Sequence, residues 1–304
     1  MSSRRLKSYL MLISVAAIWG AAGPVIKFTL QGIDPLPFLS YRLLISGVIS
    51  LIFFLVKFQK GKKFNRLRTH LPSAILYGFL SVPLALGLLF VALDKTTVLD
   101  LTLIGVVGPM IIILGGALMF HDRITKREKL GIVIVLLGVL LNSFFPIFRS
   151  GSPIRLTGNL LLIVFLLADS GSVLIAKRAV QNKIKSSNLT NLAFIVGAIV
   201  IIPLAISVYG ASNLATIITT LPLKYHLGVW YMAILSGSLA YFLYVRAQRS
   251  IEVSEATLFN YLQPVFAIPL AIFWLGESLS TSFIFGAGII ALGLIIAEYK
   301  RREI

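Results

Sequence analysis

The sequence of 304 residues contains no cysteine, only three histidines and only 11 acidic residues. Without cysteine there is no disulfide, no thiolate metal site and no cysteine nucleophile. His70, His121 and His226 are far apart in the sequence, so a metal centre is not expected. There is also no GxxxxGKS phosphate-binding loop and no paired acidic motif for a metal-dependent transferase. We therefore predict that the protein is not an enzyme and needs no cofactor.

What the sequence does contain is long apolar runs. Hydrophobic residues make up 58% of the chain, charged residues 13%, and the mean hydropathy is +0.94. Too little polar surface remains for a water-soluble protein. A membrane-spanning helix needs roughly 20 apolar residues, and ten runs qualify: 8–30, 36–56, 72–93, 98–119, 129–148, 156–177, 188–209, 226–248, 255–275 and 280–299. We predict an all-α polytopic membrane protein with ten transmembrane helices.

The net charge of +17 is carried mainly by short segments between the apolar runs. With ten spans, 22 of the 28 Lys and Arg residues fall on one side of the membrane, in the N-terminus, the C-terminus and the loops around 57–71, 120–129, 177–187 and 246–254. Cytoplasmic loops carry an excess of positive residues. We therefore predict a multi-pass protein of a prokaryotic cytoplasmic membrane with both termini cytoplasmic. The charge orients the chain in the lipid bilayer and does not indicate a nucleic-acid partner.

The second half of the chain is a degenerate copy of the first. Residues 98–141 and 253–296 align without a gap, so that Thr102 matches Thr257, Pro109 matches Pro264, Gly131 matches Gly286 and Gly138 matches Gly293, each 155 positions apart. Near the start of each half, Leu10, Lys27 and Gln31 match Leu160, Lys177 and Gln181 at an offset of 150. Five helices per copy turn the second copy upside down. We predict two inverted five-helix repeats, 1–148 and 149–304, which is the usual architecture of secondary transporters.

Ionisable groups inside predicted spans are the first functional candidates, because they are costly in a bilayer. Asp169 lies near the middle of the sixth predicted span. It either binds a cationic group, exchanges a proton, or is a hydrogen-bonded carboxyl packed against small neighbours. Lys27 and Arg42 either attract an anionic group or anchor their helices by reaching the membrane surface. Asp100, at the outer end of the fourth span, is a candidate partner for one of these two cations.

Polar and aromatic side chains gather on the eighth and ninth predicted spans. Tyr241 and Tyr244 share one helical face with Gly237 and Gln248. Proline removes a helical hydrogen bond and leaves a carbonyl free one turn earlier, so Pro109 and Pro264 are predicted helix breaks and hinges. Asn260 and Gln263 precede Pro264, whereas glycines stand at the matching positions of the first half, which predicts a chemically lopsided site.

Together these patterns predict a substrate site. The first span adds Trp19, which is followed by Gly20, Gly23 and Pro24. The two glycines allow this helix to approach a neighbouring helix closely, and the proline allows it to bend. Our predicted substrate-binding residues are Trp19, Asp169, Tyr241, Tyr244, Asn260 and Gln263. Ordinary packing between membrane helices is the alternative interpretation for each of these polar groups.

On these residues the chain resembles the EamA family of the drug/metabolite transporter superfamily. The resemblance rests on the segment IWGAAGPVIK, on Arg42, and on the stretch from Pro264 through Gly276-Glu277 to Gly286 and Gly293. In the first half His121-Asp122 stands where Gly-Glu is usual. The resemblance implies ten helices in two inverted repeats around a central cavity, and export of amino acids, other metabolites or toxic compounds.

We therefore expect a secondary transporter that exports small metabolites, amino acids first, by alternating access. Either proton coupling or facilitated passage fits the sequence. A carrier of lipids or lipid-linked sugars is the alternative, since aromatic residues and long apolar faces suit that role too. A polytopic membrane enzyme is disfavoured by the lack of a catalytic constellation, and a receptor or scaffold gives no reason for an inverted duplication.

Overall fold

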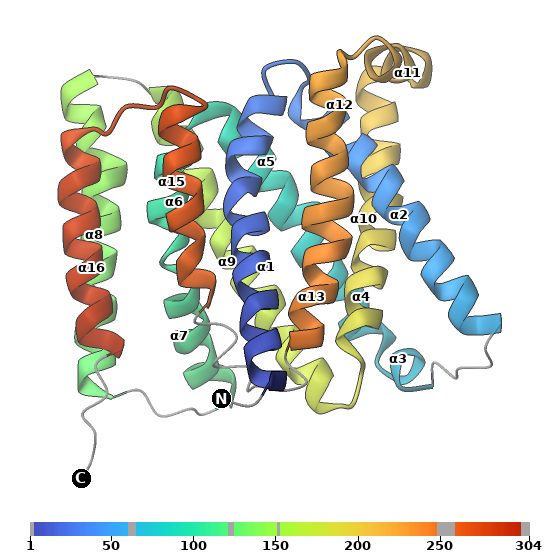
Figure 1. The fold of residues 1–304 in the computed structure, drawn as a ribbon, viewed down its shortest axis with the longest axis horizontal. Helices are drawn as coiled ribbons and strands as arrows, with labels where there is room; N and C mark the ends of the chain where they lie inside the picture. Colours follow the sequence, from blue (N-terminus) through green and yellow to red (C-terminus); the bar gives the residue numbers. More distant parts are fainter. Residues whose placement is uncertain (1–2, 60–64, 121–124, 151–152, 248–258, 299–304) are drawn as a thin grey trace.

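A computed structural model describes residues 3–59, 65–120, 125–150, 153–247 and 259–298 (Figure 1). This part of the chain is all-helical and contains no β-strand. The helices stand side by side along one common direction. The end at which α1 begins, at the bottom of Figure 1, is called the lower end below, and the end at which α1 finishes is called the upper end.

The described helical segments of the first half have between 5 and 27 residues. They are α1 (Ser3–Thr29), α2 (Pro35–Gln59), α3 (Asn65–Thr69), α4 (Leu71–Phe79), η1 (Leu80–Leu86), α5 (Gly87–Lys95), α6 (Val98–Gly105), α7 (Gly108–Phe120) and α8 (Lys126–Ser150). Those of the second half are α9 (Pro153–Gln181), α10 (Ser186–Tyr209), α11 (Ala211–Thr219), α12 (Leu223–Trp230), η2 (Tyr231–Leu239), α13 (Ala240–Ala247), η3 (Phe259–Leu262), α15 (Gln263–Phe273) and α16 (Thr281–Glu298).

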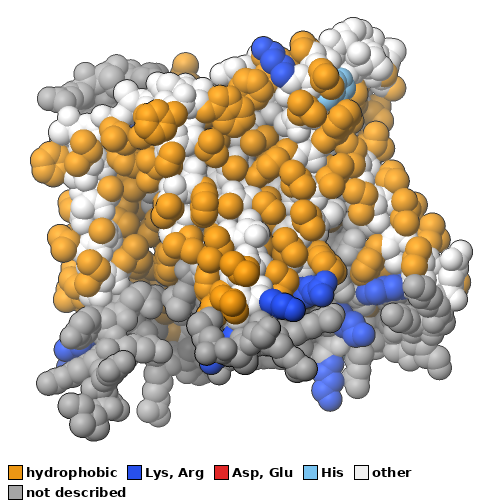
Figure 2. All heavy atoms as spheres, in the orientation of Figure 1, with side chains coloured by type: hydrophobic (Ala, Val, Ile, Leu, Met, Phe, Trp, Pro, Cys, Tyr) orange, Lys and Arg blue, Asp and Glu red, His pale blue; other side chains and the backbone are white. Residues whose placement is uncertain are grey.

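The helices are long and apolar enough for a multi-pass membrane protein. Seven described segments qualify as spans by length and hydropathy, and three shorter apolar helices are 129–142, 259–273 and 283–296. Figure 2 shows a broad belt of apolar side chains around the middle of the visible face, with Lys and Arg gathered mainly near the lower end. Such an apolar belt is suited to lipid and would be unfavourable in water. The protein is therefore an integral membrane protein.

Helices from the two halves of the chain pack against each other in pairs. α8 packs on α16 at the left side of the bundle in Figure 1, and α2 packs on α10 at the right side. Between these pairs, α1 contacts α12, η2, α13 and α15, while α9 contacts α4, η1, α5, α6 and α7. The first helix of each half is thus embedded among helices that belong mainly to the other half.

α1 and α9 run in opposite directions. Lys27, near the end of α1, interacts electrostatically with Glu277, and Glu277 with Asp100. Arg155, near the start of α9, pairs with Asp100. The end of α1 and the start of α9 therefore meet at the upper end.

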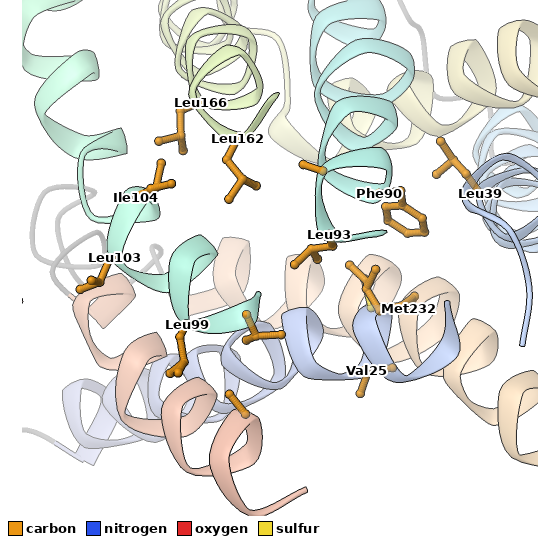
Figure 3. Close-up of a cluster of buried hydrophobic side chains, with 14 of the residues drawn as sticks. Val25, Leu39, Phe90, Leu93, Leu99, Leu103, Ile104, Leu162, Leu166 and Met232 are labelled. Carbon is orange, nitrogen blue, oxygen red and sulfur yellow. The ribbon is translucent and has the colours of Figure 1, made fainter. Parts of the chain in front are cut away.

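One dense part of the main hydrophobic core lies near the upper end of the bundle. Figure 3 shows its central side chains, which include Val25, Leu39, Phe90, Leu93 and Leu99. They come from α1, α2, α5 and α6, and each lies within about two helical turns of the upper end of its helix. Tight apolar packing excludes water there.

Two long helices contain π-helical segments in their middles. η1 interrupts the helix from Leu71 to Lys95 and contains Pro83, while η2 interrupts the helix from Leu223 to Ala247. A π-helical turn widens the backbone and realigns the carbonyl groups, and such segments are frequent at functional sites. The two interruptions occupy similar places in the two halves of the chain.

Candidate substrate site

Three of the predicted site residues form one aromatic cluster. The ring of Trp19, on α1, lies 5.2 Å from that of Tyr241 and 5.3 Å from that of Tyr244, both on α13. Trp19 Nε1 donates a hydrogen bond of 3.1 Å to the carbonyl oxygen of Ser236, within η2. The π-helical segment thus holds the indole in place. The indole ring of Trp19 faces the two tyrosine rings at distances typical of favourable aromatic pairs.

Asp169 lies beside this cluster on α9. Its carboxyl group interacts electrostatically with Tyr241 and with Tyr77 of α4, and its side chain is partly buried. The next residue, Ser170, donates a hydrogen bond of 3.4 Å to the carbonyl oxygen of Gly108. Asp169 is therefore next to the residue of α9 that contacts a helix break, and its charge acts on Tyr241.

That break separates α6 from α7 and directly precedes Pro109. α6 ends at Gly105, two turn residues follow, and Pro109 is the second residue of α7. Proline is well suited to the first turn of a helix, where its missing N–H is not needed. Pro109 therefore lies directly after the break between α6 and α7, and its role as a hinge stays a prediction.

Pro264 likewise stands at the start of a helix. A short 3₁₀ segment, η3, precedes α15, in which Pro264 is the second residue. Asn260 and Gln263 bond to each other, with Nε2 of Gln263 donating to Oδ1 of Asn260 at 3.3 Å. The backbone of this segment packs so closely on α1 that a Cβ at Gly20 would lie 2.6 Å from the carbonyl oxygen of Gln263. The structure thus places the backbone of Gln263 against α1 at Gly20, and the side chains of Asn260 and Gln263 are hydrogen-bonded to each other.

Arg42 is the most buried of the candidate cations. Its side chain, on α2, is 3% exposed. The guanidinium lies over the ring of Phe90, 5.6 Å from the ring centroid, and interacts electrostatically with Tyr241. It does not reach the membrane surface, so anchoring by snorkelling does not describe it.

Lys27, by contrast, has a structural role at the upper end. Its Nζ donates to the carbonyl oxygens of Leu93 at 2.6 Å and Asp94 at 3.3 Å. These carbonyls belong to the last turn of α5, where positive charge is favourable. Lys27 therefore closes the end of that helix.

The expectation that Asp100 pairs with Lys27 or Arg42 is wrong. Asp100 is fully buried and bonds instead to Arg155, with Nε 2.7 Å from Oδ2 and Nη2 2.9 Å from Oδ1. Asn142 Nδ2 donates to Asp100 Oδ1 at 3.0 Å, and the Thr96 hydroxyl lies 3.0 Å from Oδ2. The hydropathy pattern predicts that Arg155 lies in a loop. In the structure it lies in the first turn of α9, where it forms a bidentate ion pair with Asp100. This network ties α6, α8 and α9 together at the upper end.

Glu277 joins the two halves of the chain at the same end. Its two carboxylate oxygens accept hydrogen bonds from the backbone N–H groups of Val98, at 2.7 Å, and Leu99, at 2.9 Å. A carboxylate is favoured at the start of a helix, here α6. Burial raises the pKa of Glu277 above its ordinary value of 4.5, while these two N–H groups and Lys27 oppose that rise.

Some of this arrangement was missed by sequence reasoning. η1 and η2, Tyr77 and the partners of Asp100 were not anticipated. Asn142 offered a signal, because an amide in an apolar run needs a buried partner. Within the described residues, no group of three or more His, Asp or Glu is placed to hold a metal ion.

Comparison with known proteins assigns the chain to a family. The profile of the EamA-like transporter family matches residues 6–144 and again residues 156–299. The chain is similar to the Uncharacterized transporter YyaM of Bacillus subtilis, with 24% identity over 97% of this chain and 94% of that protein. It is also similar to the Uncharacterized inner membrane transporter YedA of Escherichia coli K12, with 27% identity over 94% of this chain and 88% of that protein.

A solved crystal structure, described only as that of a protein, matches with a TM-score of 0.61 at 15% identity over 96% of both chains. At that identity the match shows the fold alone. The two family matches together cover nearly the whole chain, and the relatives are named as transporters of similar length. This chain is therefore a membrane transporter that belongs to the EamA-like transporter family.

Proposed function

We propose that the protein is a secondary transporter that exports small metabolites, amino acids first, across a prokaryotic cytoplasmic membrane by alternating access. The observation that carries this proposal is a pair of equivalent contacts at the two helix breaks. Gly20 of α1 packs on the carbonyl of Gln263, and Ser170 of α9 bonds to the carbonyl of Gly108. At the offsets of 150 and 155 found in the sequence, Gly20 corresponds to Ser170 and Gly108 to Gln263.

These paired contacts support the proposed repeats, 1–148 and 149–304. The opposite directions of α1 and α9 fit inverted copies, and the family profile matches once within each range. An inverted pair gives a transporter two alternative arrangements related by symmetry, with the substrate site near the middle. We propose ten spans, with the lower end and both termini in the cytoplasm, because the basic residues gather there.

The proposed substrate site lies below the apolar side chains that fill the upper end. Trp19, Tyr241, Tyr244 and Asp169 surround it, with Asn260 and Gln263 beside it. Aromatic faces bind apolar side chains, while a carboxylate binds an ammonium group or carries a proton. Trp19 and Asp169 occupy corresponding positions of the two repeats, so the site is chemically lopsided, as a small asymmetric solute requires.

A transport assay with Asp169→Asn tests the role of this carboxylate. The purified protein is reconstituted into liposomes, and metabolites are screened for uptake with and without a proton gradient. Asp169→Asn is expected to abolish gradient-driven uptake while the melting temperature stays close to that of the wild type. Asp94→Asn removes an exposed carboxylate at the upper end and serves as the matched control.

Unchanged transport by Asp169→Asn would remove this residue from the mechanism. A screen in which only lipids or lipid-linked sugars are moved would favour the alternative carrier function over metabolite export.

A further inference from the structure

Arg42 is a buried cation without a counter-ion in the described part of the protein. Its Nε and Nη1 atoms are fully buried and have no hydrogen-bond partner there. Described ion pairs involve Lys95 with Asp94 and Arg155 with Asp100, and neither includes Arg42. The contact with Phe90 compensates a guanidinium only in part, since it leaves the N–H groups unsatisfied.

An unpaired buried charge lowers the stability of a protein, so its presence at Arg42 suggests a function. Removing a guanidinium from water is costly, and an apolar residue of similar size would pack against Phe90 without that cost. Arg155, in the same protein, shows the ordinary solution, a carboxylate and two close hydrogen bonds. We infer that the Nε and Nη1 groups of Arg42 bind a partner that is not part of the described chain.

The surroundings of Arg42 place that partner in the proposed substrate site. Both Arg42 and Asp169 interact electrostatically with Tyr241. Tyr241 is 37% exposed even though Trp19 and Phe194 contact its ring, so open space adjoins it. Arg42 approaches Tyr241 from α2 and Asp169 approaches from α9. The proposed site thus has a positive group and a negative group that both act on the phenol of Tyr241.

We propose that Arg42 binds the carboxylate of a zwitterionic substrate, while Asp169 faces its ammonium group. This assignment rests on the proposed function and specifies the class of its substrate. A guanidinium matches a carboxylate in shape and charge, and it binds with two parallel hydrogen bonds. A phosphate dianion fits less well, because the carboxylate of Asp169 repels its second charge.

Stability without any ligand gives a first test. Arg42→Gln removes the unpaired charge and keeps a polar side chain, so the melting temperature of the purified, ligand-free protein is expected to rise by about 2 °C or more. Arg68→Gln, which removes an exposed cation from α3, is the control and should change little. A clear fall in melting temperature for Arg42→Gln would show that Arg42 has a structural role, and would overturn the proposal.

Ligand-induced stabilisation gives the second test. The common amino acids are compared, each with its own amide, and inorganic phosphate is tested alongside. We expect at least one amino acid to raise the melting temperature of the wild type and its amide to have little effect. In Arg42→Gln that amino acid should bind about 10- to 100-fold more weakly, and Arg42→Lys should recover part of the affinity.

Equal binding of amino acid and amide, binding of phosphate alone, or no response to any carboxylate would each overturn the carboxylate assignment. The transport screen separates this failure from that of the proposed function. Uptake of a solute without a carboxylate, unchanged in Arg42→Gln, would leave the protein a transporter and remove Arg42 from substrate binding.

Discussion

The pair formed by Asp100 and Arg155 predicts unequal costs for removing its two members. Arg155→Met leaves the carboxylate of Asp100 completely buried, and among the described residues only the side chains of Thr96 and Asn142 then remain in hydrogen-bond range. Breaking a buried ion pair in this way costs about 3–5 kcal/mol. Asp100→Asn instead leaves Arg155, whose side chain is 28% exposed and can reach water. Loss of the charged hydrogen bonds then costs about 1.5–3 kcal/mol.

The double variant separates the pair from its surroundings. Asp100→Asn combined with Arg155→Met leaves no uncompensated charge at this position, so its cost should be smaller than the sum of the single costs. The expected difference is about 0.5–3 kcal/mol, the range found for residues in direct contact.

Unfolding in mixed micelles, driven by increasing sodium dodecyl sulfate, measures these free energies. The three tryptophans of the chain report the transition by fluorescence. The reasoning fails if Arg155→Met costs no more than Asp100→Asn, or if the two effects add. Since the pair lies at the upper end, away from Trp19 and Tyr241, the substrate affinity of folded Asp100→Asn should equal that of the wild type.

Two further predictions concern the close helix contact at Gly20 and the half-buried carboxyl group of Glu277. Gly20→Ala should destabilise the protein by about 1–3 kcal/mol in the same unfolding assay, because the added methyl group meets the backbone of α15 at Gln263. Gly171→Ala, where no atom lies within 4 Å of the added group, should be neutral or stabilise by up to about 1 kcal/mol; equal losses would contradict the close contact. For Glu277 the folded-state pKa is raised, so its contribution to stability is present below pH 4.5 and is lost as the pH rises through the folded-state pKa. The melting temperature of the wild type should therefore fall with rising pH relative to Glu277→Gln, and parallel curves would exclude this effect.

Much of the helical architecture could be predicted from hydropathy. Each of the ten apolar runs overlaps a helix, because a backbone in lipid must satisfy its own hydrogen bonds. The breaks before Pro109 and Pro264 also follow from local chemistry, since proline cannot donate the missing bond. η1 and η2 could not be foreseen in this way. A π-helical turn depends on which neighbouring side chains and carbonyls stabilise it, as Trp19 does for Ser236.

For the site, the sequence predicted residue types better than partners. Trp19, Tyr241 and Tyr244 were selected from two distant segments, and the structure brings them together because α1 packs against α13. The partner of Asp100 was wrong because loop and span were divided by hydropathy, which hides the arginine at the start of α9. Pairwise contacts between helices carry no signature in a single sequence.

The sequence by itself determined the membrane setting, the approximate helices, the repeated pattern and the family resemblance, because these depend on composition and spacing along the chain. Only the tertiary structure decided what each charge does. Lys27, Arg42 and Arg155 look alike as cations near the outer ends of apolar runs. Lys27 caps a helix, Arg155 pairs with a buried carboxylate, and Arg42 is buried with its Nε and Nη1 groups unsatisfied within the described residues. The difference depends on which atoms of neighbouring helices face each guanidinium or ammonium group. In the membrane interior those atoms decide whether the free-energy cost of burying the charge is offset.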